Sequence, residues 1–243
     1  VEEIVSGKPR IIILNKADLA NPRATDKWIS YYEKKGIPVL PMSVGNSKNK
    51  KKLLQVIRDT AEPILAKWKR RGMKSRSVRL MILGIPNVGK SSLINFLAGT
   101  AATRTANTPG HTRGKQWVRL SEGLDLLDTP GVLWPKFDDQ TAAQRLAATG
   151  AIAGDVFNAS EVVAELMSSL AKTSPEILKE QYNIENPDQD PQVLLEQAGR
   201  RRGCLLPGGN IDFDRAEMVV LRDFRNGKLG RITLDPIPEG KDE

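Results

Sequence analysis

Two stretches of sequence decide the fold: Asn15-Lys-Ala-Asp18 and Gly84-Ile-Pro-Asn-Val-Gly-Lys-Ser91. The second stretch fits the pattern G-x-x-x-x-G-K-[ST], a loop whose backbone N–H groups surround nucleotide phosphates. The first stretch directly follows the apolar run Ile11–Leu14 and fits N-K-x-D, the pattern that reads a guanine base. Proteins with both patterns ordinarily carry the phosphate loop first. Because the order is reversed here, we expect a circular permutation of that fold.

Length and charge set the broad class of the protein. With 243 residues, of which 40% are hydrophobic, the chain can bury one α/β core and carry a smaller second domain. Lys and Arg number 37 against 29 Asp and Glu, which gives a formal net charge of +8. For a nucleotide-binding protein this balance favours a second, polyanionic partner, and nucleic acid is the first candidate.

The cysteine content and the hydropathy of the sequence indicate in which cellular compartment the protein is expected. Cys204 is the only cysteine, so one chain can form neither a disulfide framework nor a Cys-based zinc site. We therefore expect a reducing, cytoplasmic setting. No apolar run approaches the ~20 residues that span a bilayer, so we expect no membrane partner. The chain begins at Val1 rather than Met, and we expect it to lack its natural N-terminus.

Strand-like and helix-like segments alternate up to about residue 140. Strands are expected at Arg10–Leu14, Val39–Met42, Arg79–Leu83, Trp117–Leu120 and Leu124–Leu127, the last two as a hairpin. Helices are expected at Asp26–Lys35, from about Lys48 to Trp68, and at Ser91–Ala98. This alternation predicts an α/β fold with a doubly wound, mostly parallel sheet, whose motif-bearing loops meet at the carboxyl edge.

Beyond residue 140 the pattern becomes helical. Helices are expected at Ala142–Thr149, Ser160–Lys172, Pro175–Tyr182, Gln192–Arg202 and Asp214–Asn226, with Ser160 and Ser174 as N-caps. Within the last of these, a strand at Val219–Leu221 is the alternative. Two domains follow from this change. Residues 1–140 are predicted to form a circularly permuted P-loop GTPase domain, with a linker at about 67–78, and residues 141–243 a small all-helical domain.

The phosphate loop contains the first group of candidate site residues. Lys90 is predicted to reach the β- and γ-phosphates, and the Ser91 hydroxyl to bind Mg²⁺. Val88, Gly89 and Ser92 complete the predicted nucleotide contacts of this loop. Because the loop begins a helix, the helix dipole also favours negative charge at this point.

A later group of residues is predicted on the Mg²⁺ and γ-phosphate side. Asp128 ends an apolar strand, where a Walker-B-type ligand belongs, and Gly131 can offer its N–H to a γ-phosphate. The alternative is an ordinary strand-to-turn Asp-x-Pro-Gly. Thr112 is the candidate switch-one threonine, contacting Mg²⁺ and γ-phosphate, and Thr108 is its competitor. His111, the only histidine, is more typical of a solvated loop side chain than of a catalytic base.

Asp18 is predicted to determine the choice of base. Its carboxylate can accept from two guanine donors, whereas adenine would leave this charged acceptor unpaired. Asn15 and Lys16 belong to the same motif. Ser43 and Val44, after the next predicted strand, match the backbone motif that lies behind the guanine. The alternative for residues 15–18 is a surface turn with a helix cap.

The chain closely resembles the YlqF family of circularly permuted GTPases, the bacterial ribosome biogenesis GTPase A, through its motif order and three stretches: Gly84-Ile-Pro-Asn-Val-Gly-Lys-Ser-Ser92, Asp128-Thr-Pro-Gly-Val-Leu-Trp-Pro-Lys-Phe137 and Arg202-Gly-Cys204. The resemblance covers essentially the whole chain. It implies a GTPase that uses GTP, GDP and Mg²⁺ and binds the large ribosomal subunit precursor and its rRNA. It further implies that the protein leaves the ribosomal particle after GTP hydrolysis. We expect a monomer.

The resemblance also bears on catalysis. Val132 stands where Ras-like enzymes have the glutamine that orients water, and family members share this substitution. Similarity to cation-activated GTPases points to Asn87, whose side-chain oxygen would hold K⁺; a loop-stabilising amide is the alternative. The predicted catalytic residues are Asn87, Lys90, Thr112 and Gly131. The family begins with a further segment, carrying a histidine and an Asp-Ala-Arg motif, so we expect slower turnover from this chain.

Two basic groups are candidate RNA contacts. They comprise Lys67, Lys69, Arg70, Arg71, Lys74, Arg76 and Arg79, and, near the C-terminus, Arg200–Arg202, Arg222, Arg225, Lys228 and Arg231. Charge runs are usually solvated faces. The net charge and the resemblance favour rRNA phosphates instead. Two other classes stay open: an ATP-dependent P-loop kinase in which Asn15–Asp18 is accidental, and a GTP-binding signalling module without RNA contact.

Overall fold

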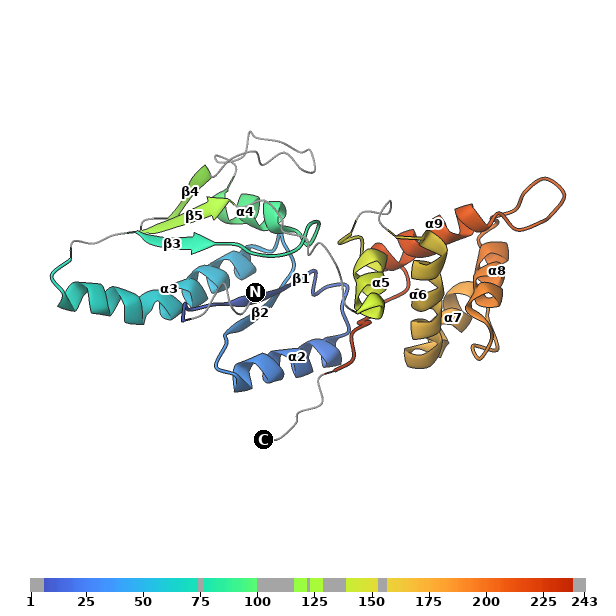
Figure 1. Ribbon diagram of the computed structural model, residues 1–243, viewed down its shortest axis with the longest axis horizontal. Coiled ribbons are helices and arrows are strands. Elements are labelled where there is room, and N and C mark those ends of the chain that lie inside the picture. The colour runs from blue at the N-terminus through green and yellow to red at the C-terminus, as the bar shows by residue number, and fades with distance from the viewer. Residues whose placement is uncertain are drawn as a thin grey trace. The chain divides into compact units, whose positions relative to one another are not determined.

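The computed structural model describes residues 7–73, 77–99, 116–121, 123–128, 139–152 and 157–237 (Figure 1). These residues form two compact units. The first unit contains residues 7–18 and those described between 22 and 128, together with Ile237. The second contains Leu19–Asn21 and the residues described between 139 and 236. The domain boundary predicted at residue 140 stays a prediction, because residues 129–138 beside it lie outside the described residues.

Strand pairing in the first unit is mostly parallel. β1 (Ile12–Asn15) pairs in parallel with β2 (Val39–Met42), and β3 (Val78–Met81) with β5 (Leu124–Asp128). β4 (Gln116–Ser121) runs antiparallel to β5 and completes the predicted hairpin. Within the described ranges these pairs form two sheets, β1-β2 and β3-β5-β4. Parallel pairing brings the carboxyl ends of both partners to one edge, where the predicted site loops begin.

The core of the first unit joins its strands to helices α3 (Ser47–Arg70) and α4 (Lys90–Ala98). Leu53, Ile57 and Ala61 repeat every four residues, so one face of α3 is buried. Opposing residues of this core include Leu40 of β2 and Leu93 of α4. A fully buried leucine or isoleucine contributes about 1.5–3 kcal/mol, so this face holds α3 against the strands.

Helix boundaries in the first unit follow local signals. α2 (Pro22–Lys34) begins earlier than the expected Asp26, at a proline, which fits the first turn of a helix. The Asn46 side chain caps α3 by accepting from the Lys48 N–H at 3.0 Å. α3 continues to Arg70, so the start of the predicted linker forms its last turn. Cations in that turn are favoured by the helix dipole.

Five helices make up the second unit: α5 (Gln140–Ala148), α6 (Ala159–Thr173), α7 (Pro175–Tyr182), α8 (Pro191–Arg201) and α9 (Phe213–Arg225). α6 contacts the other four (Figure 1). Gly199 lets α8 approach α9 closely, because a Cβ there would lie 2.9 Å from the Ala216 Cβ. The predicted all-helical character is confirmed across the described part of this unit.

One predicted cap in the second unit is wrong. The N-cap of α6 is Asn158, whose side chain accepts from the Ser160 N–H at 3.0 Å. The Ser160 hydroxyl instead donates to the carboxylate of Glu217, which is buried on α9. Ser174 does occupy the N-cap position of α7, although its side chain makes no capping hydrogen bond. The Ser160 hydroxyl therefore makes a tertiary hydrogen bond instead of the helix cap that the local sequence predicts.

The short segment Leu19–Asn21 is attached to the second unit by three hydrogen bonds. The Leu19 carbonyl accepts from the Ile232 N–H at 3.0 Å, and the Ala20 carbonyl from Arg231 Nε at 2.9 Å. The Asn21 N–H donates to the Thr233 hydroxyl oxygen at 3.1 Å. These partners are more than 200 residues away in sequence, and nothing in the local pattern predicts them.

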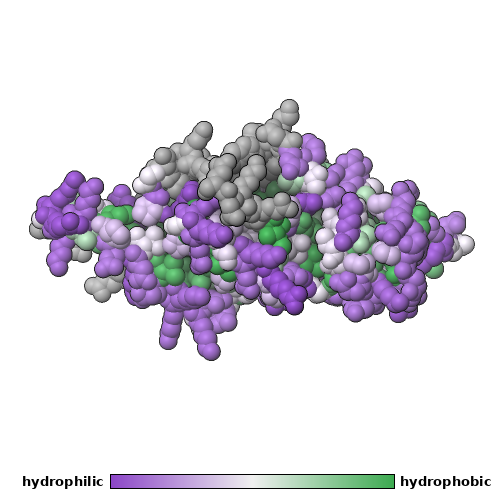
Figure 2. All heavy atoms as spheres, turned by 90° about the horizontal axis from the view of Figure 1, so that it is seen from below, coloured by the Kyte–Doolittle hydropathy of each residue, from purple (hydrophilic) through white to green (hydrophobic). Residues whose placement is uncertain are grey.

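Hydrophilic residues dominate the molecular face drawn in Figure 2, with hydrophobic residues in small areas between them. Among the residues that the structure describes, no helix is long and apolar enough to cross a membrane.

Candidate nucleotide-binding site

The phosphate loop connects β3 to α4 in the predicted strand-loop-helix arrangement. Asn87 and Gly89 have left-handed backbones, with φ of +55° and +96°. Gly89 is the N-cap of α4 and supplies no side-chain cap, and the helix dipole favours an anion at this helix start. Lys90 Nζ lies 2.5 Å from the Ile85 carbonyl oxygen, which folds this cation back over the loop.

Asn15 joins the two defining motifs. It ends β1, and its Nδ2 donates to the Val88 carbonyl of the phosphate loop at 2.8 Å, across 73 residues of sequence. Any Cβ at position 89 would overlap this Nδ2, so the contact requires glycine there. Asn15 Oδ1 is buried and has no hydrogen-bond partner among the described residues. A buried acceptor of this kind fits a site that receives a polar ligand.

Asp18 is held by the residue that follows β2. The Ser43 hydroxyl donates to Asp18 Oδ1 and accepts from the Asp18 N–H at 3.2 Å. Asn49, in the first turn of α3, donates to the Ser43 carbonyl at 3.1 Å. The preceding Ala17 N–H bonds to the Met42 carbonyl at 3.2 Å. These bonds fix the Asp18 carboxylate at the carboxyl edge of β1 and β2.

The remaining base-side residues lie beside this arrangement. Lys16 is exposed and has a left-handed backbone, with φ of +56°, which turns the chain between Asn15 and Asp18. Val44 follows Ser43 and is 36% exposed, so apolar surface is available next to the carboxylate. The roles predicted for Asn15, Lys16, Asp18, Ser43 and Val44 stay predictions. Sequence analysis did not select Asn49, which bonds to the Ser43 carbonyl and whose only local signal is its place near a helix start.

The Mg²⁺ side is described only in part. Ser91 and Ser92 lie exposed in the first turn of α4. Asp128 is the last residue of β5, one position beyond Leu127, which pairs with Met81 at the end of β3. Its backbone is therefore at the same sheet edge as the start of the phosphate loop. Further predictions, for Thr108, His111, Thr112, Gly131, Val132 and Trp134–Phe137, lie outside the described residues.

The residues present fit a guanine nucleotide by three observations. The phosphate loop carries a helix start without a side-chain cap and a lysine. Asn15 packs closely against Gly89, where a Cβ would overlap it. The third observation is a carboxylate held by Ser43 in the same motif as the buried, unpaired Asn15 amide oxygen. Such a carboxylate can accept two donors of one base edge. The arrangement brings the base-reading motif into direct contact with the phosphate motif, as the predicted permuted fold requires.

Comparison with known proteins identifies relatives of this chain. A family described as 50S ribosome-binding GTPase matches residues 79–195. A protein of Priestia megaterium named ribosome biogenesis GTPase A is 40% identical over 99% of this chain and 84% of its own length. Two solved structures have a TM-score of 0.66 with this chain. The GDP-bound structure of TM YlqF is 28% identical and covers 95% of this chain and 84% of its own.

The second solved structure is GNP-bound YlqF from T. maritima, which is 27% identical and covers 97% of this chain and 84% of its own. A further relative, ribosome biogenesis GTPase A of Thermotoga maritima, is 30% identical over 95% of this chain and 77% of its own length. The predicted P-loop fold with its permuted motif order and helical C-terminal part is thereby confirmed. This chain belongs to the ribosome biogenesis GTPase A family.

Proposed function

We propose that this protein binds GTP through the joined motifs, hydrolyses it on the maturing large ribosomal subunit, binds rRNA there and leaves after hydrolysis. The observation that carries the proposal is the hydrogen bond from Asn15 to the Val88 carbonyl, because it places the base-reading loop against the phosphate loop. GTP hydrolysis is the activity of the family to which the chain belongs. The names of the relatives support the ribosomal setting, and we place the protein in the cytoplasm.

The base side of the site is proposed to select guanine through Asp18. The Ser43 hydroxyl occupies one oxygen of this carboxylate, and the fixed orientation directs the other lone pairs to the ring N–H and exocyclic amine of the base. Asn15 Nδ2 gives one hydrogen to the Val88 carbonyl, and its second hydrogen is proposed to be donated to the acceptor edge of the base. Lys16 and Val44 cover the two faces of the ring. Adenine would leave the Asp18 carboxylate without a donor.

The phosphate side is proposed to act by charge stabilisation. The N–H groups of Val88, Gly89 and Ser92 surround the β-phosphate, and Lys90 leaves the Ile85 carbonyl to neutralise the β- and γ-oxygens. Mg²⁺, when bound, supplies charge stabilisation of the phosphates. Its proposed ligands in this chain are Ser91, Thr112 and Asp128. The Gly131 N–H and Thr112 are proposed to contact the γ-phosphate.

Asn87 is proposed to hold K⁺ against the phosphates. The left-handed backbone at this residue, with φ of +55°, turns an exposed side chain out of the phosphate loop. The positive charge of K⁺ would then act where other GTPases use an arginine finger. Replacing K⁺ by Na⁺ in a phosphate-release assay should lower the rate in the native protein but not in Asn87→Ala, whose rate should already be low. Equal rates in the two salts would leave Asn87 as a loop amide.

The RNA partner is proposed from the charge distribution. The end of α3 carries Lys67, Lys69 and Arg70 in one turn, and the ends of α8 and α9 carry further arginines. Each phosphate neutralised by such a side chain releases counterions. Affinity for rRNA should therefore fall steeply as salt is raised.

Sedimentation with large-subunit precursors tests the whole proposal. The protein should pellet with precursor particles in the presence of a non-hydrolysable GTP analogue and stay in the supernatant with GDP. Mature small subunits serve as the control particle. Equal pelleting with both nucleotides would refute release after hydrolysis, and the absence of pelleting in either state would refute the ribosomal assignment.

A further inference from the structure

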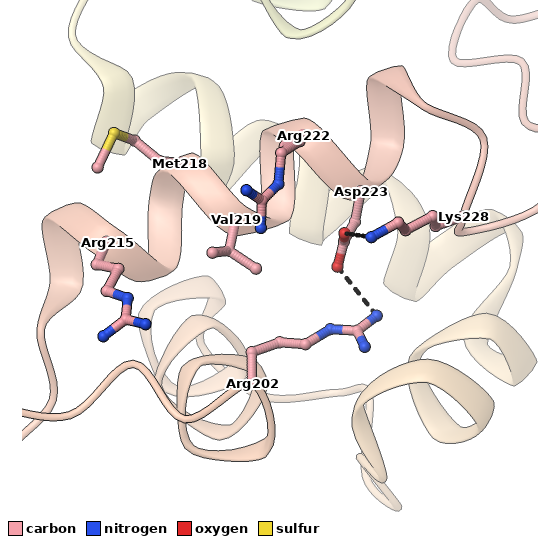
Figure 3. A pocket seen from close by; sticks show the side chains of 7 residues that line it. All are labelled: Arg202, Arg215, Met218, Val219, Arg222, Asp223 and Lys228. Atoms are coloured by element: carbon pink, nitrogen blue, oxygen red, sulfur yellow. Dashed lines mark ion pairs between the residues drawn. The ribbon is translucent and has the colours of Figure 1, made fainter.

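A basic pocket lies in the second unit, between the end of α8 and one face of α9 (Figure 3). Its volume of about 450 Å³ is in the range of small-ligand sites, ~300–1,000 Å³. The lining residues are four cations, one carboxylate and two apolar side chains: Arg202, Arg215, Arg222, Lys228, Asp223, Met218 and Val219. Four cations against one carboxylate leave three positive charges in excess, so the pocket favours an anionic group.

Asp223 anchors two of the four cations. Its carboxylate is 2% exposed, and a charge buried to that extent requires partners. Arg202 Nη2 lies 2.9 Å from Oδ2, and Lys228 Nζ lies 3.4 Å from Oδ1. Figure 3 shows Arg202 reaching across from the end of α8 to this carboxylate on α9. The two cations are thus positioned before any ligand arrives.

Arg202 is also held from a second side. Its guanidinium carbon lies 5.3 Å from the centre of the Tyr182 ring, within reach of a cation–π contact. Burial raises the pKa of the Tyr182 hydroxyl, so the ring stays neutral beneath the guanidinium. Only one edge of the Arg202 fork faces Asp223. The Arg202 side chain is 31% exposed, so part of its planar fork stays accessible to an oxyanion.

The other two arginines of the pocket, Arg215 and Arg222, line it from one face of α9. Arg215, Met218, Val219 and Arg222 occupy positions i, i+3, i+4 and i+7 of α9, so they share one face of the helix. Arg215 and Arg222 are exposed, and neither guanidinium has an ion pair or hydrogen bond with a described residue. Met218 is 66% exposed between them. Apolar surface flanked by planar cations suits the face of a nucleic-acid base.

We propose that this pocket receives one unpaired nucleotide of the RNA partner, an inference that rests on the proposed rRNA binding. The phosphate lies against Arg202, Lys228 and Arg222, and the base packs on the Met218 and Val219 surface beside the Arg215 guanidinium. Proteins read RNA sequence mainly at unpaired bases, which stack on aromatic rings or arginine planes. A paired A-form helix presents a wide, shallow minor groove and cannot enter a concave site of this size.

Two fluorescent RNA hairpins test the inference: one with a single bulged nucleotide in its stem, and one with the same stem fully paired. Affinities are measured by fluorescence anisotropy on the full chain at one fixed salt concentration, since phosphate contacts depend on salt. The native protein should bind the bulged RNA about ten-fold more tightly, the size expected for one stacked base. Arg215→Gln and Arg222→Gln should each remove most of that preference.

Matched variants separate stacking from charge. Arg201→Gln removes the same charge at the end of α8 without touching the pocket, so both affinities should fall equally and the preference should remain. Arg215→Lys keeps the charge but removes the planar group, so it should keep the affinity for the paired RNA and reduce the preference. Thermal melting should be unchanged in these variants, because the Arg215 and Arg222 side chains are exposed and unpaired within the described structure.

Three outcomes overturn the inference. Equal affinity of the native protein for the two hairpins would show that the pocket does not select an unpaired nucleotide, although rRNA binding itself would stand. A preference kept in both Arg215→Gln and Arg222→Gln would place the selecting site elsewhere. Competition by polyglutamate at matched charge concentration would assign the pocket to an acidic protein segment. Failure to bind either hairpin would instead refute the proposed RNA binding.

Discussion

The junction between the two motifs can be tested by Gly89→Ala. The residue has a φ of +96°, and an added Cβ would overlap Asn15 Nδ2. A left-handed backbone costs an L-residue about 1–2 kcal/mol, and losing the Asn15–Val88 hydrogen bond costs about 0.5–1.5 kcal/mol. The free energy of unfolding should therefore fall by about 1.5–3.5 kcal/mol. GTP affinity should fall too, since both the phosphate loop and the base-side amide are displaced.

Gly36→Ala is the matched control. Gly36 also has a left-handed backbone, with φ of +70°, but an added Cβ there meets nothing within 4 Å. This variant should lose only the backbone part, about 1–2 kcal/mol, and keep its GTP affinity. Urea unfolding without nucleotide and titration with a fluorescent GTP analogue measure the two quantities. Equal destabilisation in the two variants, with native GTP affinity in Gly89→Ala, would refute the steric reasoning at this junction.

Three shorter predictions concern single side chains. Asp18→Asn should shift preference from guanine towards xanthine nucleotides, because the amide presents a donor where guanine has donors; unchanged GTP affinity would contradict the assignment. Lys90→Ala should abolish GTP binding without changing the melting temperature, whereas Ser91→Ala should weaken binding chiefly when Mg²⁺ is present; titrations with and without EDTA distinguish them. Asn158→Ala should lower the free energy of unfolding by about 1 kcal/mol through loss of the α6 cap, as measured by urea unfolding.

The sequence predicted those parts of the fold that are determined by neighbouring residues in the chain. The β2 and α7 boundaries agree with expectation because a short apolar run and a proline at the first helical turn are local signals. The site motifs likewise carry their own backbone requirements, such as the left-handed glycine at position 89. The sequence therefore predicted where these motifs lie in the fold, whereas the roles of their side chains toward a nucleotide stay predictions.

Long-range partners were not predictable. The hydroxyl of Ser160 looks like a cap in sequence, yet it bonds to Glu217, 57 residues away, and Asn158 takes over the capping. The bond from Asn15 to Val88 and the pairing of Asp18 with Ser43 also depend on how strand ends meet. The sequence shows which polar residues stand at these positions, but the packing of the strands and helices decides which of their atoms form hydrogen bonds. The same holds for Asp223, whose burial between Arg202 and Lys228 has no local signal.

The three hydrogen bonds of Leu19–Asn21 affect how this protein can be divided or recombined. The segment starts one peptide bond after Asp18, yet its partners are Arg231, Ile232 and Thr233. A truncation after residue 140 would deprive all three bonds of their partners, directly after Asp18 in the chain. A chimera with another family member would have to exchange residues 19–21 along with the helical part. The two units are interleaved in sequence, so neither corresponds to one continuous stretch of the chain.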